Sequence, residues 1–222
     1  MLNDFFSNID VEDIIEATNE TLYMTVLSLI GTVIFGLLLG LLLYLTNKDG
    51  IWQNRYVYLI TSSFVNVFRA IPFIILILLL FPFTDFLIGT VRGPNAALPA
   101  LIIGSAPFYA RLVEIALIEV DKGVVEAAKS MGAKTSTIIF KVLLPESMPA
   151  LISGITVTSI ALIGYTAMAG VIGAGGLGNH AHYYGFMRRD FDVVLVCTIV
   201  IVIIVFIFQF IGDYLSKRID KR

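Results

Sequence analysis

Charged residues and cysteines are scarce in this chain. Only 14% of its 222 residues are charged, whereas 58% are hydrophobic, and the mean hydropathy is +0.90. A water-soluble domain of this length needs far more polar surface, so the composition predicts an integral membrane protein. Cys197 is the single cysteine, which excludes a disulfide within the chain and gives no indication of redox chemistry.

The sequence also lacks a nucleotide-binding loop. No G-x-x-x-x-G-K-[ST] motif is present to hold phosphates, and no polar region is large enough for an ATPase fold. His180 and His182 have no cysteine or clustered carboxylates near them, so we expect no metal site. Nothing in the sequence suggests binding to nucleic acid. We therefore expect a chain that is not an enzyme and holds no cofactor of its own.

Long segments without charge give the positions of the membrane crossings. The charge-free segments between Glu20 and Lys48 and between Asp192 and Asp213 hold 27 and 20 residues, and about 20 residues are enough for one helical crossing. The runs are too long and too continuously apolar for alternating strands of a β-barrel. We therefore expect an all-α membrane protein. Its five predicted crossings are residues 22–45, 57–82, 95–118, 148–170 and 193–215.

The fourth apolar run is long enough for two crossings. It extends for 41 residues from Ser147 to Met187 and holds five glycines between 170 and 178. Such a glycine cluster favours one helix followed by a turn or a re-entrant segment, although six crossings remain an alternative. The cluster has the spacing G-x-G-x-x-G, but a dinucleotide site also needs a preceding strand and a following helix. We expect a tight external turn instead.

The distribution of lysine and arginine predicts the orientation in the membrane. Residues 46–56, 119–146 and 213–222 contain ten of these cations, and the opposite loops contain three. The positive-inside rule places the cation-rich loops in the cytoplasm and the acidic N-terminal segment, residues 1–20, outside. No basic region precedes the first apolar run, so we expect no cleaved signal peptide.

A charged, amphipathic segment lies within the predicted cytoplasmic loop 119–146. Its sequence from Glu126 to Pro145 is EAAKSMGAKTSTIIFKVLLP, which predicts a short, part-buried helix that faces a partner. Small residues at 127, 128 and 132 allow another protein to approach the backbone closely. We expect Pro145 to end the helix and redirect the chain. The alternative is an ordinary amphipathic loop helix of some other membrane protein.

Three charged side chains lie well inside predicted crossings. Arg69 is about 13 residues into the second crossing, and Pro72 soon after it predicts a kink there. Arg69 could line a substrate pathway, or it could be a structural clamp bound to helix-end carbonyls or to a carboxylate such as Glu114, which we favour. Arg111 and Glu114 have the spacing of an i, i+3 pair and are expected to bind each other.

Gly36 and Gly40 form a G-x-x-x-G pair in the first crossing. This spacing permits close contact between helices. The pattern fits packing within one subunit or between two subunits equally well.

The motif Glu126-Ala127-Ala128, with Gly132, Leu144 and Pro145 at fixed distances, resembles the EAA signature of permease subunits of bacterial ATP-binding-cassette (ABC) importers. Val142 stands where an isoleucine is usual. FRAIPFIILILL at 68–79, IGSAPFYARLVEIAL at 103–117 and GYTAMAGVIGAGGLG at 164–178 are similar to the methionine branch of this family. The similarity extends from about residue 20 to the end. It implies a single permease domain, 1–222, with the type I importer fold and a coupling helix between the third and fourth crossings.

The resemblance also implies partners and a mechanism. Two copies would form the pathway in the bacterial inner membrane, two ATPase subunits would bind ATP and Mg²⁺ on the cytoplasmic side, and an extracytoplasmic binding protein would deliver the substrate. Transport would follow alternating access, with methionine (D- or L-) or a related amino acid as the substrate. The residues implied in coupling to the ATPase are Glu126, Ala127, Ala128, Gly132, Leu144 and Pro145.

Two other functions are compatible with part of this pattern. A self-sufficient secondary transporter or channel usually carries several intramembrane carboxylates or a repeated half, and Glu114 is the only acid well inside a predicted crossing. A non-transporting membrane scaffold would explain the cytoplasmic helix but not the similarity along the other helices. An importer permease accounts for both.

Overall fold

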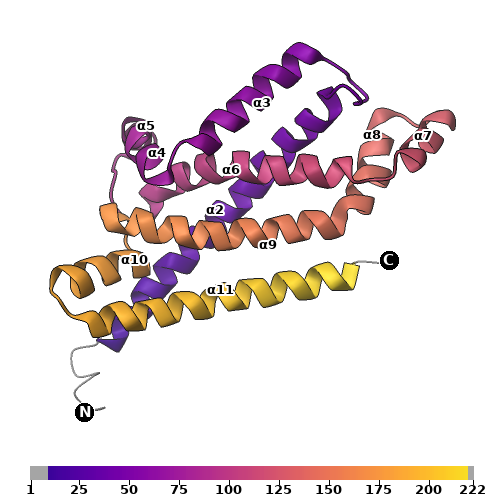
Figure 1. The fold of residues 1–222 in the computed structure, drawn as a ribbon. Coiled ribbons are helices and arrows are strands. Elements are labelled where there is room, and N and C mark those ends of the chain that lie inside the picture. Colours follow the sequence, from indigo (N-terminus) through magenta and orange to yellow (C-terminus); the bar gives the residue numbers. More distant parts are fainter. Residues whose placement is uncertain (1–9, 220–222) are drawn as a thin grey trace. The chain divides into compact units, whose positions relative to one another are not determined.

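The computed structural model describes residues 10–219, and this part of the chain is helical without a strand. Residues 1–9 of the predicted N-terminal segment and the cations Lys221 and Arg222 lie outside the described part. The first elements are α2 (Val11–Thr46), α3 (Arg55–Ala70), α4 (Phe73–Leu79), α5 (Phe81–Ile88), α6 (Pro94–Ile118), α7 (Lys122–Ser130) and α8 (Thr135–Ile138). They are followed by η1 (Ile139–Leu143), α9 (Leu144–Ala169), η2 (Gly170–Ala174), α10 (Gly176–His180), η3 (Ala181–Met187) and α11 (Phe191–Ile219), where η denotes π-helix (Figure 1).

The described helices agree with the prediction of five crossings. Four helical segments are long and apolar enough to cross a membrane, and α3 with α4 forms a fifth if this bent pair is one span. The predicted limits 95–118 and 193–215 correspond to α6 and α11. α2 begins at Val11, so residues 11–20 are part of the first long helix and not a separate segment before it.

The second crossing is broken where the sequence predicts a kink. The axes of α3 and α4 differ by 106°, and Pro72 lies between them with φ −56° and ψ 134°. Proline lacks a backbone N–H and disfavours helical geometry at the residue before it, so α3 ends at Ala70. The predicted crossing 57–82 is therefore not one straight helix.

Pro145 does not end a helix, contrary to the prediction. Helical structure continues from Thr135 to Ala174, and Pro145 is the second residue of α9, directly after the π-helical turn η1. Proline is tolerated in the first turn of a helix because the N–H that it lacks has no obligatory partner there.

The fourth apolar run holds one long helix followed by a glycine-rich turn, as predicted. Gly173, Gly175 and Gly176 have φ values of 100°, 85° and 77°, a backbone region that side chains other than glycine rarely adopt. The helices that follow, α10 and η3, have five and seven residues. In the described chain they are too short for a sixth crossing, and no strand precedes the G-x-G-x-x-G spacing.

The described residues form two compact units. Among the described residues, the first consists of 10–31, 71–104 and 159–209. In it, Phe73 and Tyr165 stack with ring centroids 4.5 Å apart, next to the buried side chains of Met24 and Leu101. Buried contacts from four separate parts of the chain thus hold this unit together.

The described residues of the second unit are 32–70, 105–158 and 210–219. Its core includes Tyr109, Val113 and Leu117 of α6 and Leu143 of η1. The G-x-x-x-G pair of α2 packs against α6: a Cβ at Gly36 would lie 2.9 Å from the Ala106 carbonyl oxygen. In this structure the pair therefore serves packing within one chain.

We expect Gly40→Ala to destabilise the protein. The added Cβ would lie 2.5 Å from the Val113 Cβ and 2.6 Å from the Ala110 carbonyl oxygen, so the helices must move apart, at a cost of about 1–3 kcal/mol. Thermal unfolding of the purified protein in detergent measures this loss. Gly164→Ala is the control, because a Cβ there meets no atom of the chain within 4 Å. Equal melting of the two variants would contradict the close packing.

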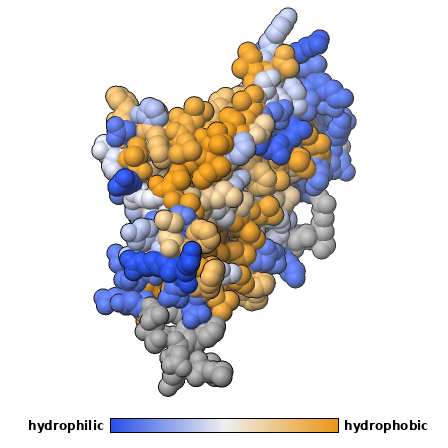
Figure 2. All heavy atoms as spheres, turned by 60° about the vertical axis from the view of Figure 1, so that its left-hand side comes forward, coloured by the Kyte–Doolittle hydropathy of each residue, from blue (hydrophilic) through white to orange (hydrophobic). Residues whose placement is uncertain are grey.

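Many large apolar side chains of the described helices are exposed, and the face in Figure 2 carries broad orange areas. In the apolar part of α11 only 11% of the residues are buried, and exposed side chains include Phe206 and Phe210. An apolar surface of this extent is unfavourable in water but suits contact with lipid or with another membrane subunit.

Candidate coupling site

The predicted partner-facing segment consists of α7, a tight turn, α8 and η1. α7 begins after Asp121, whose carboxylate accepts a hydrogen bond from the Gly123 N–H at 2.6 Å, so the side chain caps the helix. α7 ends at Ser130, and Gly132 follows with φ +76°. A glycine in this conformation just after a helix is the usual way to reverse the chain. Gly132 therefore lies in the turn and not in the helix. Glycine suits this position because it has no side chain and adopts the positive φ of the turn readily.

One side of α7 packs against the chain itself. Val125 and Ala128 are buried in the core that contains Leu117 and Leu143. Leu144 also packs against this core. Two of the six predicted coupling residues, Ala128 and Leu144, thus hold the segment in place, while Glu126, Ala127, Gly132 and Pro145 are exposed.

The adjoining side of α7 presents an apolar stripe to the surroundings. Val124, Ala127 and Met131 are exposed, and the Met131 side chain is 81% accessible. Their i, i+3, i+7 spacing puts them on one side of a helix. We call these three residues the docking stripe. Phe140, 68% accessible in η1, is a further exposed apolar side chain of the segment that the EAA pattern does not indicate.

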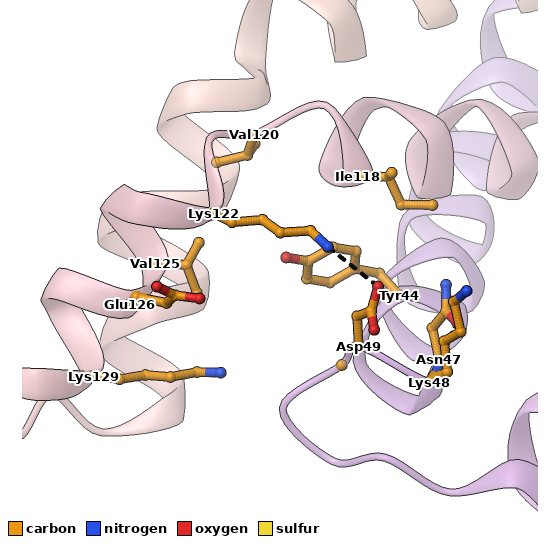
Figure 3. A pocket seen from close by; sticks show the side chains of 11 residues that line it. Tyr44, Asn47, Lys48, Asp49, Ile118, Val120, Lys122, Val125, Glu126 and Lys129 are labelled. Atoms are coloured by element: carbon orange, nitrogen blue, oxygen red, sulfur yellow. Dashed lines mark hydrogen bonds and ion pairs between the residues drawn. The ribbon is translucent and has the colours of Figure 1, made fainter.

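A pocket of about 280 Å³ separates α7 from the ends of α2 and α6. Figure 3 shows Glu126 and Lys129 of α7 on one side and Asn47 and Lys48 on the other. The Lys122 Nζ donates to the Asp49 Oδ2 at 3.2 Å across it. Both side chains are largely exposed, so this ion pair contributes little to stability.

The pocket wall formed by the α2–α3 loop has a fixed backbone. The Trp52 N–H donates to the Leu45 carbonyl at 2.9 Å, and the Asn54 N–H donates to the Thr46 carbonyl at 3.0 Å. A Cβ at Gly50 would lie 2.2 Å from the Leu45 oxygen. The loop thus folds back tightly onto the end of α2.

Two of the three charged residues considered inside the crossings, Arg111 and Glu114, form a cluster that does not include Arg69. Glu114 is 1% accessible and accepts hydrogen bonds from Arg111 and, at 3.2 Å, from the Tyr58 hydroxyl. The predicted Arg111–Glu114 pair is confirmed, and Tyr58 ties α3 to it. Arg69 is exposed in the last turn of α3. The alternative in which Arg69 binds Glu114 is wrong, because Arg111 and Tyr58 bind that carboxylate. A clamp between Arg69 and helix-end carbonyls stays a prediction.

We expect Glu114→Ala to destabilise the protein by about 3 kcal/mol, because it leaves the Arg111 guanidinium and the Tyr58 hydroxyl without their acceptor. Glu114→Gln retains an acceptor oxygen and should lose less. Thermal unfolding in detergent distinguishes the variants, with Glu119→Ala as the control because Glu119 is exposed just after α6. A Glu114→Ala protein as stable as the control would show that the cluster does not hold α3 to α6.

Known proteins match this chain over most or all of its length. A family model described as "Binding-protein-dependent transport system inner membrane component" matches residues 33–221. The chain is 64% identical over 222 residues, all of both proteins, to the methionine import system permease protein MetP of Bacillus subtilis (strain 168). It is 47% identical to the probable D-methionine transport system permease protein MetI of Pasteurella multocida (strain Pm70), over 93% of this chain and 95% of the relative. The similarity therefore begins before residue 20, and the prediction that it starts there is wrong.

A solved structure has the same fold. It is described as inward facing conformations of the MetNI methionine ABC transporter in the CY5 native crystal form, and its matching chain is 42% identical with a TM-score of 0.93. The match covers 94% of this chain and 97% of that one. The predicted all-α membrane fold of a type I ABC importer permease is confirmed, and the chain belongs to the family of inner membrane components of binding-protein-dependent transport systems.

Proposed function

We propose that this chain is the membrane-spanning permease subunit of an ABC importer for methionine. The identity of 64% over the whole length to a methionine import permease carries this proposal. The match leaves out no part of either chain, so it includes the segments that line the pathway and the segments that gate it. One relative is named for import of methionine and another for transport of D-methionine, so the proposal covers both isomers of the substrate.

The working transporter is a homodimer of this chain with two ATPase subunits and an extracytoplasmic binding protein. Five crossings are few for enclosing a polar conduit, which favours a closed twofold assembly. The extensive exposed apolar surface supports contacts with lipid and with a second copy. ATP and Mg²⁺ belong to the separate ATPase subunit, because this sequence has no loop for nucleotide phosphates.

The docking stripe is the surface that receives the ATPase subunit. It is apolar and exposed, and it lies on a helix whose adjoining side is anchored by Val125 and Ala128. Because α7 is anchored in this way, a movement of the bound ATPase subunit moves η1 and α9 together with α7. Glu126 is exposed on the same helix, and Gly132 shapes the turn beside the stripe. Pro145 is exposed in the first turn of α9. Ala128 and Leu144 act through anchoring, not through direct contact.

The docking stripe faces the cytoplasm, and the glycine-rich turn faces the outside. The excess of lysine and arginine in the loops 46–56, 119–146 and 213–222 supports this orientation. It also puts the stripe on the side where ATP is available. Arg69, exposed beside the bend between α3 and α4, is free to line the pathway near its middle.

ATP-dependent uptake of radiolabelled methionine into proteoliposomes tests the proposed function. The vesicles hold this chain, its ATPase and its binding protein, and the control uses an ATPase that cannot hydrolyse ATP. We expect uptake with the active ATPase alone, and excess unlabelled D- or L-methionine shows which isomer competes. A stable ATPase complex without methionine uptake would overturn the substrate assignment. A secondary transporter would take up substrate without the ATPase.

A further inference from the structure

Two neighbouring side chains of α2 hold the glycine-rich turn in place. The Glu20 Oε2 accepts a hydrogen bond from the Gly176 N–H at 2.6 Å. The Thr21 Oγ1 accepts one from the Leu177 N–H at 2.9 Å. These contacts link positions 156 residues apart in the sequence, and all four residues belong to the same compact unit.

The two contacts supply the hydrogen-bond acceptors that the first N–H groups of α10 do not find in its own N-cap residue. The first N–H groups of a helix have no partner within the helix and usually bond to the side chain of the N-cap residue. The N-cap of α10 is Gly175, which has no side chain. Glu20 and Thr21 therefore cap α10 from another helix, and the carboxylate also interacts favourably with the positive end of the helix dipole.

The glycines of the turn leave the space that this capping needs. A Cβ at Gly175 would lie 2.5 Å from the Glu20 Oε2, and a Cβ at Gly176 would lie 2.7 Å from the Thr21 Oγ1. Gly178 faces α9 in the same way, with a Cβ position 2.3 Å from the Ala167 carbonyl oxygen. Close docking onto α2 and α9 thus accounts for the glycine cluster that resembles a dinucleotide motif.

The two capping side chains differ in their access to solvent. Thr21 and Leu177 are buried, whereas Glu20 is only half-buried. Glu20 borders a pocket of about 140 Å³ that is also lined by Asp13, Glu16 and other polar residues. Water in this pocket can replace the Gly176 N–H as a partner of the carboxylate. Gly176 is buried, so its N–H would lose its acceptor unless the turn itself moves away from α2 when the contact opens.

We infer that Glu20 is a positioning residue of the transport cycle, and that its hydrogen bond to Gly176 is a latch that opens in each cycle. The inference rests on the proposed function. The solved chain that this fold matches with a TM-score of 0.93 comes from inward-facing conformations. In such a conformation the outer side is closed, and the latch holds the glycine-rich turn against α2. When ATP binding opens the outer side, the turn leaves α2 and the latch breaks.

Hydrogen exchange measured by mass spectrometry on the full complex in nanodiscs tests this motion. We compare the complex without nucleotide with the complex trapped by ATP, a hydrolysis-dead ATPase and the binding protein. In peptides covering residues 174–180, exchange should be at least ten-fold faster in the trapped state. Equal exchange in the two states would overturn the latch and leave Glu20 a fixed structural contact.

Variants of Glu20 test the residue itself. Glu20→Ala should speed exchange of the same peptides about ten-fold in the nucleotide-free complex and lower the maximal rate of methionine uptake with little change in KM. Glu20→Gln keeps an acceptor oxygen and should restore both quantities to within about three-fold of the unaltered protein. Glu16→Ala, one turn away and exposed, is the control.

The two measurements separate failure of the latch from failure of the proposed function. Absent methionine uptake by the unaltered complex would count against the function, whereas exchange in the nucleotide-free complex reports the Glu20 contact without substrate. If Glu20→Ala exchanges and transports like Glu16→Ala, the latch is wrong. The same holds if Glu20→Gln is as impaired as Glu20→Ala.

Discussion

Replacing Ala127 with arginine should release the ATPase subunit while the permease remains folded. Ala127 is exposed between Val124 and Met131 on the docking stripe, so the larger, charged side chain disturbs no packing within this chain. In a docked complex it would bury a charge at the centre of an apolar contact. We expect roughly a hundred-fold loss of affinity, about 2.8 kcal/mol, as for a central interface residue. Co-purification of the ATPase and ATP-dependent uptake both measure this loss.

Ser136→Arg is the matched control for this experiment. Ser136 is exposed in α8, so the same charge enters the same cytoplasmic segment away from the stripe. It should retain the ATPase to within a few-fold. If both arginine variants release the ATPase equally, net charge and not the stripe governs docking. If neither releases it, the docking surface lies elsewhere.

Replacing Gly132 with valine should weaken coupling to the ATPase subunit, because it disturbs the backbone conformation of the turn after α7. Gly132 has φ +76° with no atom within 4 Å of an added Cβ, so the loss comes from conformation and not from a clash. The left-handed conformation costs about 1–2 kcal/mol for a residue with a Cβ and is least favourable for β-branched ones. The turn after α7 should shift and misplace the docking stripe. We expect uptake about ten-fold lower with normal insertion into the membrane.

Gly132→Asn distinguishes the two possible roles of this glycine. Asparagine adopts the left-handed conformation more readily than other side chains, so uptake should stay within about two-fold of the unaltered protein. A small-residue contact with the ATPase predicts the opposite, because asparagine is larger than glycine. Equal failure of the valine and asparagine variants would therefore favour direct contact over turn geometry.

Most of the fold follows from the sequence because lipid imposes a simple rule. A helix that crosses a bilayer needs a long run without charge, and the predicted segment 95–118 differs from α6 by one residue at its start. The break near Pro72 and the glycine-rich turn follow from backbone chemistry, since proline and glycine act locally. The Arg111–Glu114 pair follows from helical spacing.

The features that sequence patterns miss depend on tertiary contacts. Ala127 and Ala128 are adjacent and identical in type, yet one is exposed and the other is buried against the core. Pro145 follows the π-helical turn η1, which no local signal predicts, so the helix continues where a stop is expected. Glu20 lies in an acidic run typical of a solvated helix face, and its partner is 156 residues away.

Photo-cross-linking from the docking stripe tests the central claim most directly, namely that this surface receives the ATPase-driven motion. A photoreactive amino acid replaces Met131 in one complex and the exposed Asn19 of α2, on the proposed outer side, in another. We expect a cross-link to the ATPase subunit from position 131 and none from position 19, with a yield at 131 that changes when ATP binds. A complex that takes up methionine but gives no ATPase cross-link from position 131 would contradict the claim.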